Sequence, residues 1–229
     1  MTLRQSFTII TEQSVSLKDI KGYMSPKFVD RDQKKTDIAL ASLPVFSKGF
    51  ETANIDQIAK AAGIGKGTIY EYFDSKQEIF QTAVEVWIDQ STKTIRNLLS
   101  DIDNPVEALK QFVETATSMF NPNNSEVLGI FNTIQQQTLS ETGIYYNDRY
   151  KIRDMCTGGL TIITDILLDG ISKGTFKPEI ARDIDIIARN MLSYLDGIGL
   201  WSGLMPKGEF DYTTHVNHFF NLYLEMITI

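Results

Sequence analysis

"GFETANIDQIAKAAGIGKGTIYEYFDSKQEIF" spans residues 49–80 and decides the fold. Asn54 is a favourable N-cap, and Gln57 three residues later can complete a capping box. Gly63 is expected to end this helix, and a shorter helix follows over residues 66–73. Two short helices joined by a glycine-containing turn predict a helix-turn-helix. Ser75 with Glu78 forms a second capping-box pattern, which predicts the start of a long helix.

The shorter helix divides into an anchoring side and an outward side. Ile69 and Phe73 are four residues apart, so they can root it in a small apolar core. The outward residues carry hydrogen-bonding groups: Thr68, Tyr70, Glu71 and Tyr72. In a major groove, a threonine offers a hydroxyl and a methyl to base edges, and tyrosine hydroxyls can reach phosphates. Glu71 could accept a hydrogen bond from a cytosine amine, although a solvated side chain is the favoured interpretation.

The residues around the turn fit phosphate binding. Gly65 and Gly67 leave backbone N–H groups open, and Lys66 and Lys76 flank the element as phosphate clamps. Residues 27–80 contain eight Lys/Arg and eight Asp/Glu, whereas residues 81–229 contain eleven and nineteen. The net charge of −7 therefore argues against a broad electrostatic DNA binder but leaves a local one possible.

The composition is that of an ordinary soluble protein, with 229 residues, 42% hydrophobic and 22% charged. The single Cys156 excludes an internal disulfide framework and suits a reducing cytoplasm, which is the expected location. We expect no signal peptide, and no apolar run approaches the roughly 18 residues of a membrane-spanning helix.

Helical periodicity continues along the rest of the chain, so the predicted fold class is all-α. Residues 1–30 are expected to form an N-terminal extension, 31–80 the helix-turn-helix domain and 81–229 a larger helical domain. Pro44 is expected to kink or shorten the helix that begins near Lys34. The later helices are expected from Ser75 to about Leu99, from about Pro105, and over 125–140, 143–172, 179–204 and 211–228.

Residues 35–80 resemble the DNA-binding domain of TetR-family transcriptional regulators. The resemblance rests on Gly49-Phe50, Ile58-Ala59, Ala62-Gly63, Lys66-Gly67-Thr68, Tyr70, Tyr72-Phe73 and Ser75-Lys76. Beyond residue 100 it is faint, and Ala53-Asn54 replaces the family's usual Thr-Thr. The resemblance implies an Ω-shaped homodimer of about nine helices per subunit that binds a palindromic operator on double-stranded DNA. The DNA contacts that it implies are Asn54, Gly65, Lys66, Gly67, Thr68, Tyr70, Tyr72 and Lys76.

The resemblance also implies a ligand-binding and dimerising C-terminal domain. Large or soft side chains on its helices are candidates for an effector pocket, although plain core is the favoured interpretation of each: Trp87, Phe112, Met119, Phe131, Cys156, Tyr194 and Trp201. An apolar lining would suit a small hydrophobic or amphipathic effector. Apolar stripes on the last two helices predict a four-helix dimer seam. The seam residues are expected to be Ile187, Met191, Leu195, Ile198, Phe219, Phe220 and Tyr223.

The leading hypothesis is therefore a ligand-responsive repressor. The alternative is a DNA-binding adaptor whose helical domain contacts a protein partner instead of a small molecule. An enzyme is disfavoured because no acid, base, nucleophile or metal set converges, and no cofactor is expected. His215 and His218 lack a third metal ligand, and Cys156 lacks a base, so surface or interface histidines and an inert thiol are favoured. The N-terminal extension, residues 1–30, could be an arm that reaches into the minor groove of DNA, although a loosely ordered tail is favoured.

Overall fold

The computed structural model describes residues 30–119, 125–206 and 209–229, which are all-helical, as predicted. These residues contain one isolated β-bridge, between Phe176 and Thr228, and no strand. The α-helices are α2 (Arg31–Phe46), α3 (Ile55–Ala62), α4 (Lys66–Tyr72), α5 (Lys76–Leu99), α6 (Pro105–Met119), α7 (Ser125–Leu139), α8 (Arg149–Ser172), α9 (Ile184–Leu204) and α10 (Tyr212–Ile227). A 3₁₀-helix, η2 (Pro178–Asp183), precedes α9.

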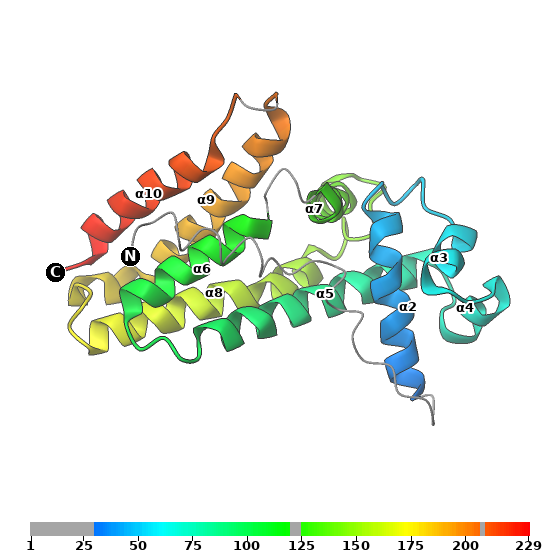
Figure 1. Ribbon diagram of the computed structural model, residues 1–229, viewed down its shortest axis with the longest axis horizontal. Helices are drawn as coiled ribbons and strands as arrows, with labels where there is room; N and C mark the ends of the chain where they lie inside the picture. Colours follow the sequence, from blue (N-terminus) through cyan, green and yellow to red (C-terminus); the bar gives the residue numbers. More distant parts are fainter. Residues whose placement is uncertain (1–29, 120–124, 207–208) are drawn as a thin grey trace.

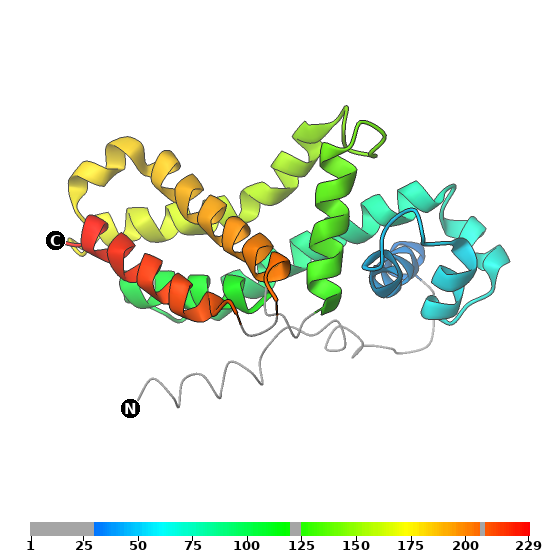
Figure 2. The same ribbon diagram turned by 90° about the horizontal axis from the view of Figure 1, so that it is seen from above.

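The molecule is elongated, with a small head at one end and a larger body at the other (Figure 1). We call residues 31–80 the head and residues 81–229 the body. The long helix α5 begins in the head and runs into the body, where α6 and α8 lie alongside it (Figure 1). Helices α9 and α10 form a pair on one side of the body, and α7 stands across α5 next to the head (Figure 2).

The head has its own apolar core. One stripe of α2 is buried, as its periodicity predicts: Ile38, Ala39, Ser42, Leu43 and Phe46. Phe46 and Phe80 meet edge to face, with their ring centroids 5.0 Å apart, which joins α2 to α5. Pro44 lies in the last turn of α2, and the helix continues through Phe46. The predicted shortening is therefore small, because a proline this close to the end disturbs little of the helix.

Helix α7 closes the head core from the body side. Ile130 and Tyr145 are buried in the same cluster as the head residues, with exposed fractions of 1% and 0%. The hydroxyl of Thr133 donates to the Phe46 carbonyl at 2.9 Å. At Gly129 an added Cβ would overlap the Ser47 carbonyl oxygen, so glycine permits this close approach. The head core therefore extends beyond residue 80 and includes part of α7.

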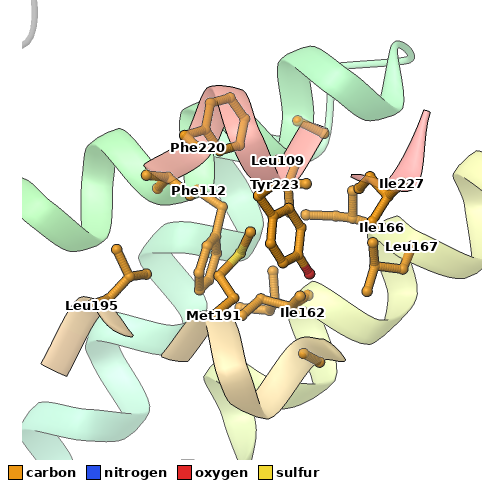
Figure 3. Close-up of a cluster of buried hydrophobic side chains, with 14 of the residues drawn as sticks. Leu109, Phe112, Ile162, Ile166, Leu167, Met191, Leu195, Phe220, Tyr223 and Ile227 are labelled. Carbon is orange, nitrogen blue, oxygen red and sulfur yellow. The ribbon is translucent and has the colours of Figure 1, made fainter. Parts of the chain in front are cut away.

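The body core lies between α6, α8, α9 and α10 (Figure 3). Leu109, Phe112, Ile163, Leu167 and Met191 are at most 2% exposed. The glycine at 158, which weakens the helical pattern in the sequence, lets α8 approach α5. An added Cβ there would lie 2.7 Å from the side chain of Thr92.

Within the described residues, no single helix is long and apolar enough to cross a membrane. Only the two halves of α8, Arg149–Met155 and Thr157–Ser172, pass that test as a bent pair. In the same part of the chain, no three His, Cys, Asp or Glu side chains are placed to hold a metal ion.

Candidate nucleic-acid interface

Helix α4 is short, and two residues root it in the head. Ile69 and Phe73 are 0% and 2% exposed, as expected from their spacing. The N–H of Phe73 donates to the Ile69 carbonyl and closes the last turn. Because these two side chains fix the rotation of the helix, the opposite arc must face solvent. The side chain of Tyr70 is 54% exposed there, and Glu71 is exposed beside it.

The candidate DNA contacts differ in exposure. Asn54, Gly65, Lys66, Gly67 and Tyr70 are exposed, whereas Thr68, Tyr72 and Lys76 are half-buried. Tyr72 packs part of its ring against the head core. A tyrosine in this position keeps its hydroxyl available while the ring is immobilised, so little side-chain entropy remains to be lost on binding.

Asn54 forms the predicted capping box at the start of α3. Its side-chain oxygen accepts from the Gln57 N–H at 3.0 Å, and the Gln57 side-chain oxygen accepts from the Asn54 N–H at 3.1 Å. Gly63 ends the helix with φ +67°, a left-handed conformation that glycine adopts without strain. The capping box uses the oxygen of the Asn54 amide and leaves its NH₂ group as a donor.

Lys66 and Lys76, the two lysines expected to bind phosphates, already contact other groups of the protein. Lys66 forms an ion pair with Asp56 at 3.0 Å, and this carboxylate raises the lysine pKa. Both groups are exposed, so solvent screens the pair and a phosphate could replace Asp56 at little cost. Lys76 donates to the carbonyls of Phe50 and Ala53 at 2.8 and 3.0 Å, which fixes the segment before α3 against α5. These two carbonyls take two of its three N–H groups.

Two contacts that the sequence does not predict join α2 to the rest of the head. Arg31 donates to the Glu71 carbonyl at 3.1 Å, and Lys35 pairs with Glu78 at 2.6 Å. Glu78 also accepts from the Asp74 N–H, while its own N–H donates to Ser75 as the capping pattern predicts. Lys35 and then the Asp74 N–H hold the pKa of Glu78 below its usual value. Helical spacing carries no signal for pairs so distant in sequence.

Among the predicted pocket residues, the five whose side chains are described lie in different surroundings. Phe112 belongs to the body core, Trp87 packs against the head core, and Trp201 is 52% exposed. The ring of Tyr194 stacks on Phe219 with centroids 3.6 Å apart. Phe131 is half-buried on α7, and the side chains of Met119 and Cys156 lie outside those described. A surface hollow of about 630 Å³ lies instead on the head, lined by Val45, Lys48, Thr52, Gln57, Lys60 and Ala61.

The predicted seam residues face inward. Met191, Leu195, Phe220 and Tyr223 point into the body core of this subunit (Figure 3), where each is at most 7% exposed. Ile198 is buried with them, and Ile187 and Phe219 pack against the same cluster. The subunit's own core thus buries five of the seven predicted seam residues, whereas Ile187 and Phe219 stay partly exposed.

Other apolar residues of α9 and α10 are exposed. Each has an exposed fraction between 47% and 65%: Ile186, Leu200, Trp201, Leu204, Leu222 and Met226. We call this set the outer apolar face. Isolated exposed leucines are ordinary, but several large apolar side chains exposed on two neighbouring helices are typical of an interaction surface.

Comparisons with known proteins agree with this architecture. Residues 40–83 match the family model described as "Bacterial regulatory proteins, tetR family". The chain is 24% identical over 152 residues to the HTH-type transcriptional repressor KstR2 of Mycobacterium tuberculosis, covering 66% of this chain and 72% of that protein. It is 27% identical over 151 residues to a fatty acid metabolism regulator protein of Bacillus subtilis, covering 65% and 71%. The structure of FadR from Bacillus subtilis with stearoyl-CoA superposes with a TM-score of 0.61 at 23% identity, covering 82% and 96%.

Proposed function

Because the chain belongs to the TetR family of helix-turn-helix transcriptional regulators, which are not enzymes, we propose that it is a repressor of a near-palindromic operator, released by a small amphipathic effector. The observation that carries this proposal is the geometry of α4. Ile69 and Phe73 hold it against the head so that Tyr70 and Glu71 face outward. A short helix rooted in this way can enter a major groove with its hydroxyl groups toward the DNA.

The DNA contacts of the proposed complex follow from chemistry. Thr68 and Tyr70 approach bases and phosphates from α4, with Tyr72 at the edge of the groove. Asn54 contributes its free NH₂ group, and the backbone N–H groups of Gly65 and Gly67 face the phosphate chain. Lys66 exchanges Asp56 for a phosphate, and Lys76 uses its remaining N–H. In this proposal a few hydrogen-bond donors in fixed positions bind the DNA, so the chain does not need a large net positive charge.

A second copy of this chain covers the outer apolar face in the proposed complex. Helices α9 and α10 of two subunits would then form a four-helix seam with Leu200, Trp201 and Leu204 near its centre. Such a dimer presents two copies of α4 to one side of a duplex. Half-sites about 34–36 Å apart, one helical turn, are the spacing that two recognition helices can read together.

The effector acts through α5 in this proposal, because α5 is shared between the head and the body. A ligand that tilts α5 changes the distance between the two heads, and a coupling free energy of roughly 1–3 kcal/mol is typical of such systems. The names of similar proteins support an amphipathic ligand: one is a fatty acid metabolism regulator, and the solved FadR contains stearoyl-CoA. We therefore put long-chain acyl-CoA first among candidate effectors.

Fluorescence anisotropy with a labelled duplex from the gene's own upstream region tests the proposal. The wild-type protein should bind one inverted repeat as a dimer and lose affinity steeply with salt. Stearoyl-CoA should release the duplex, whereas free coenzyme A at the same concentration should not. Binding that no small molecule in a thermal-shift screen affects, but that a co-purifying protein controls, would favour the adaptor. Absence of specific binding to duplex DNA would overturn both the repressor and the adaptor hypotheses.

A further inference from the structure

We propose that Arg31 is a further DNA-contacting residue, which binds a phosphate at the end of α4 opposite the glycine turn. The inference rests on the proposed function, because it requires α4 to enter the major groove. Arg31 is the first residue of α2 and is exposed. Its Nη2 atom donates to the backbone carbonyl of Glu71 at 3.1 Å, so the start of α2 is tied to the last turn of α4.

The contact to Glu71 leaves most of the guanidinium group available. A guanidinium has five N–H donors in one plane, and the carbonyl takes one of them. A carbonyl is also neutral, so this contact does not offset the positive charge of Arg31. Within the described residues, Lys35 and Lys66 are instead neutralised by the carboxylates of Glu78 and Asp56. No ion pair joins Arg31 to a carboxylate in that part of the chain.

The length of α4 places Arg31 near a phosphate strand. Seven residues make a helix about 10 Å long, and the major groove is about 12 Å wide. In the proposed complex α4 lies across the groove, so both of its ends approach a groove wall when its middle touches the bases. The glycine turn meets one wall, and the Glu71 end meets the other. A planar guanidinium held at that end suits a phosphate, which it can bind through two parallel hydrogen bonds.

Arg31 also offsets an unfavourable charge. Glu71 lies on the outward arc of α4, where its carboxylate would repel the phosphates of a bound duplex. An arginine fixed to the carbonyl of the same residue supplies the opposite charge at the same place. Arg31 thus has two roles in this proposal: the bond to Glu71 positions it, and the free edge of its guanidinium contacts the DNA.

Anisotropy titrations of the operator duplex at several salt concentrations test the proposal with three variants: Arg31→Lys, Arg31→Gln and Arg31→Ala. Each phosphate contact contributes about 0.9 to the slope of log K against log salt, so a dimer that loses two contacts should lose nearly 2. Arg31→Gln and Arg31→Ala should show this change and bind roughly tenfold more weakly per half-site. Arg31→Lys should keep the slope and much of the affinity.

A matched control removes the same charge elsewhere. Lys93 is an exposed lysine of α5, paired with Asp89 one turn away, and Lys93→Ala should leave affinity and slope unchanged. If Arg31→Ala keeps the wild-type slope, or if Lys93→Ala changes it equally, the proposal is wrong. An equal loss in all three variants, together with a lower melting temperature of the head, would show that Arg31 only holds α4 in place. If the wild-type protein binds no duplex, the proposed function fails first.

Discussion

At the scale of single residues, Gly129 allows α7 of the body to pack closely against the end of α2 in the head. It lies in α7 against the end of α2, where an added Cβ would overlap the Ser47 carbonyl oxygen. Gly129→Ala should therefore destabilise the protein by about 1–3 kcal/mol, the usual cost of overpacking, because backbone atoms cannot rotate out of the way. Urea unfolding followed by circular dichroism measures this free energy.

Gly159 provides the matched control for Gly129. It also lies inside a helix, α8, but an added Cβ would meet only the Leu192 side chain, at an ordinary 3.7 Å. Gly159→Ala should be neutral or stabilise the protein by up to about 1 kcal/mol, since alanine favours a helix. Equal effects at the two positions would contradict a specific contact between α7 and α2.

Local residue patterns could be predicted, whereas contacts across the fold could not. The Asn54–Gln57 capping box and the left-handed Gly63 lie within one helix and its ends, so their chemistry is visible in the sequence. Gly129 and Ser47 are far apart in the chain, as are Arg31 and Glu71. In the sequence, a glycine within a helical pattern indicates only a less stable helix. Its contact with another element cannot be predicted, because nothing in the sequence identifies the residue that packs against it.

At the scale of elements, Glu78 connects the start of α5 to α2. Its pKa is lowered from the ordinary 4.5 by Lys35 and by the Asp74 N–H. A depressed pKa means that the ionised form stabilises the fold above about pH 4.5, and that this stability is lost as the pH falls through the lower, folded-state value. Between about pH 5 and pH 3, the wild-type protein should therefore lose more stability than Glu78→Gln.

The expected difference is at most about 1 kcal/mol, because both side chains are about one third exposed and solvent screens the pair. Urea unfolding at both pH values measures it. Glu51→Gln, which changes an exposed carboxylate of the same head, should behave like the wild-type protein. If Glu78→Gln shows the same acid sensitivity as the wild-type protein, the pair with Lys35 does not stabilise the head.

Periodicity predicted where the helices lie in the chain and which side of each helix is apolar. It did not predict which element packs against that side. The buried stripe of α2 and the helices from 105 onward are close to those expected, although the helix predicted from 143 begins at Arg149. The apolar stripes of α9 and α10 also exist, and most of the predicted seam residues pack into the core of their own subunit. Periodicity shows that a face is apolar, but it cannot tell a subunit's own α6 and α8 from a second copy.

At the scale of the whole molecule, the outer apolar face predicts the oligomeric state. Leu204 is 65% exposed on α9, and Leu204→Glu should place two like charges in the proposed seam and shift the protein toward monomers. Multi-angle light scattering after size exclusion measures the mass. The monomeric variant should also bind the operator far more weakly, since one head reads only one half-site.

Leu168 on α8 is the control for the seam. It is 49% exposed but lies outside the outer apolar face, so Leu168→Glu should leave the mass and the operator affinity unchanged. A dimer that survives Leu204→Glu, or a wild-type protein that is monomeric at micromolar concentration, would contradict the proposed seam. The DNA-binding role of α4 would then need another arrangement of the two heads.

The most direct test of the central claim is the operator affinity of Tyr70→Ala compared with Tyr150→Ala. Both tyrosines are exposed, at 54% and 69%, but Tyr70 lies on the outward arc of α4 and Tyr150 on the body. Tyr70→Ala should weaken binding at least about tenfold, or 1.4 kcal/mol, with the fold intact by circular dichroism. Tyr150→Ala should stay within about twofold of wild type. Equal affinities for both variants and the wild-type protein would contradict the claim that this side of α4 enters the DNA.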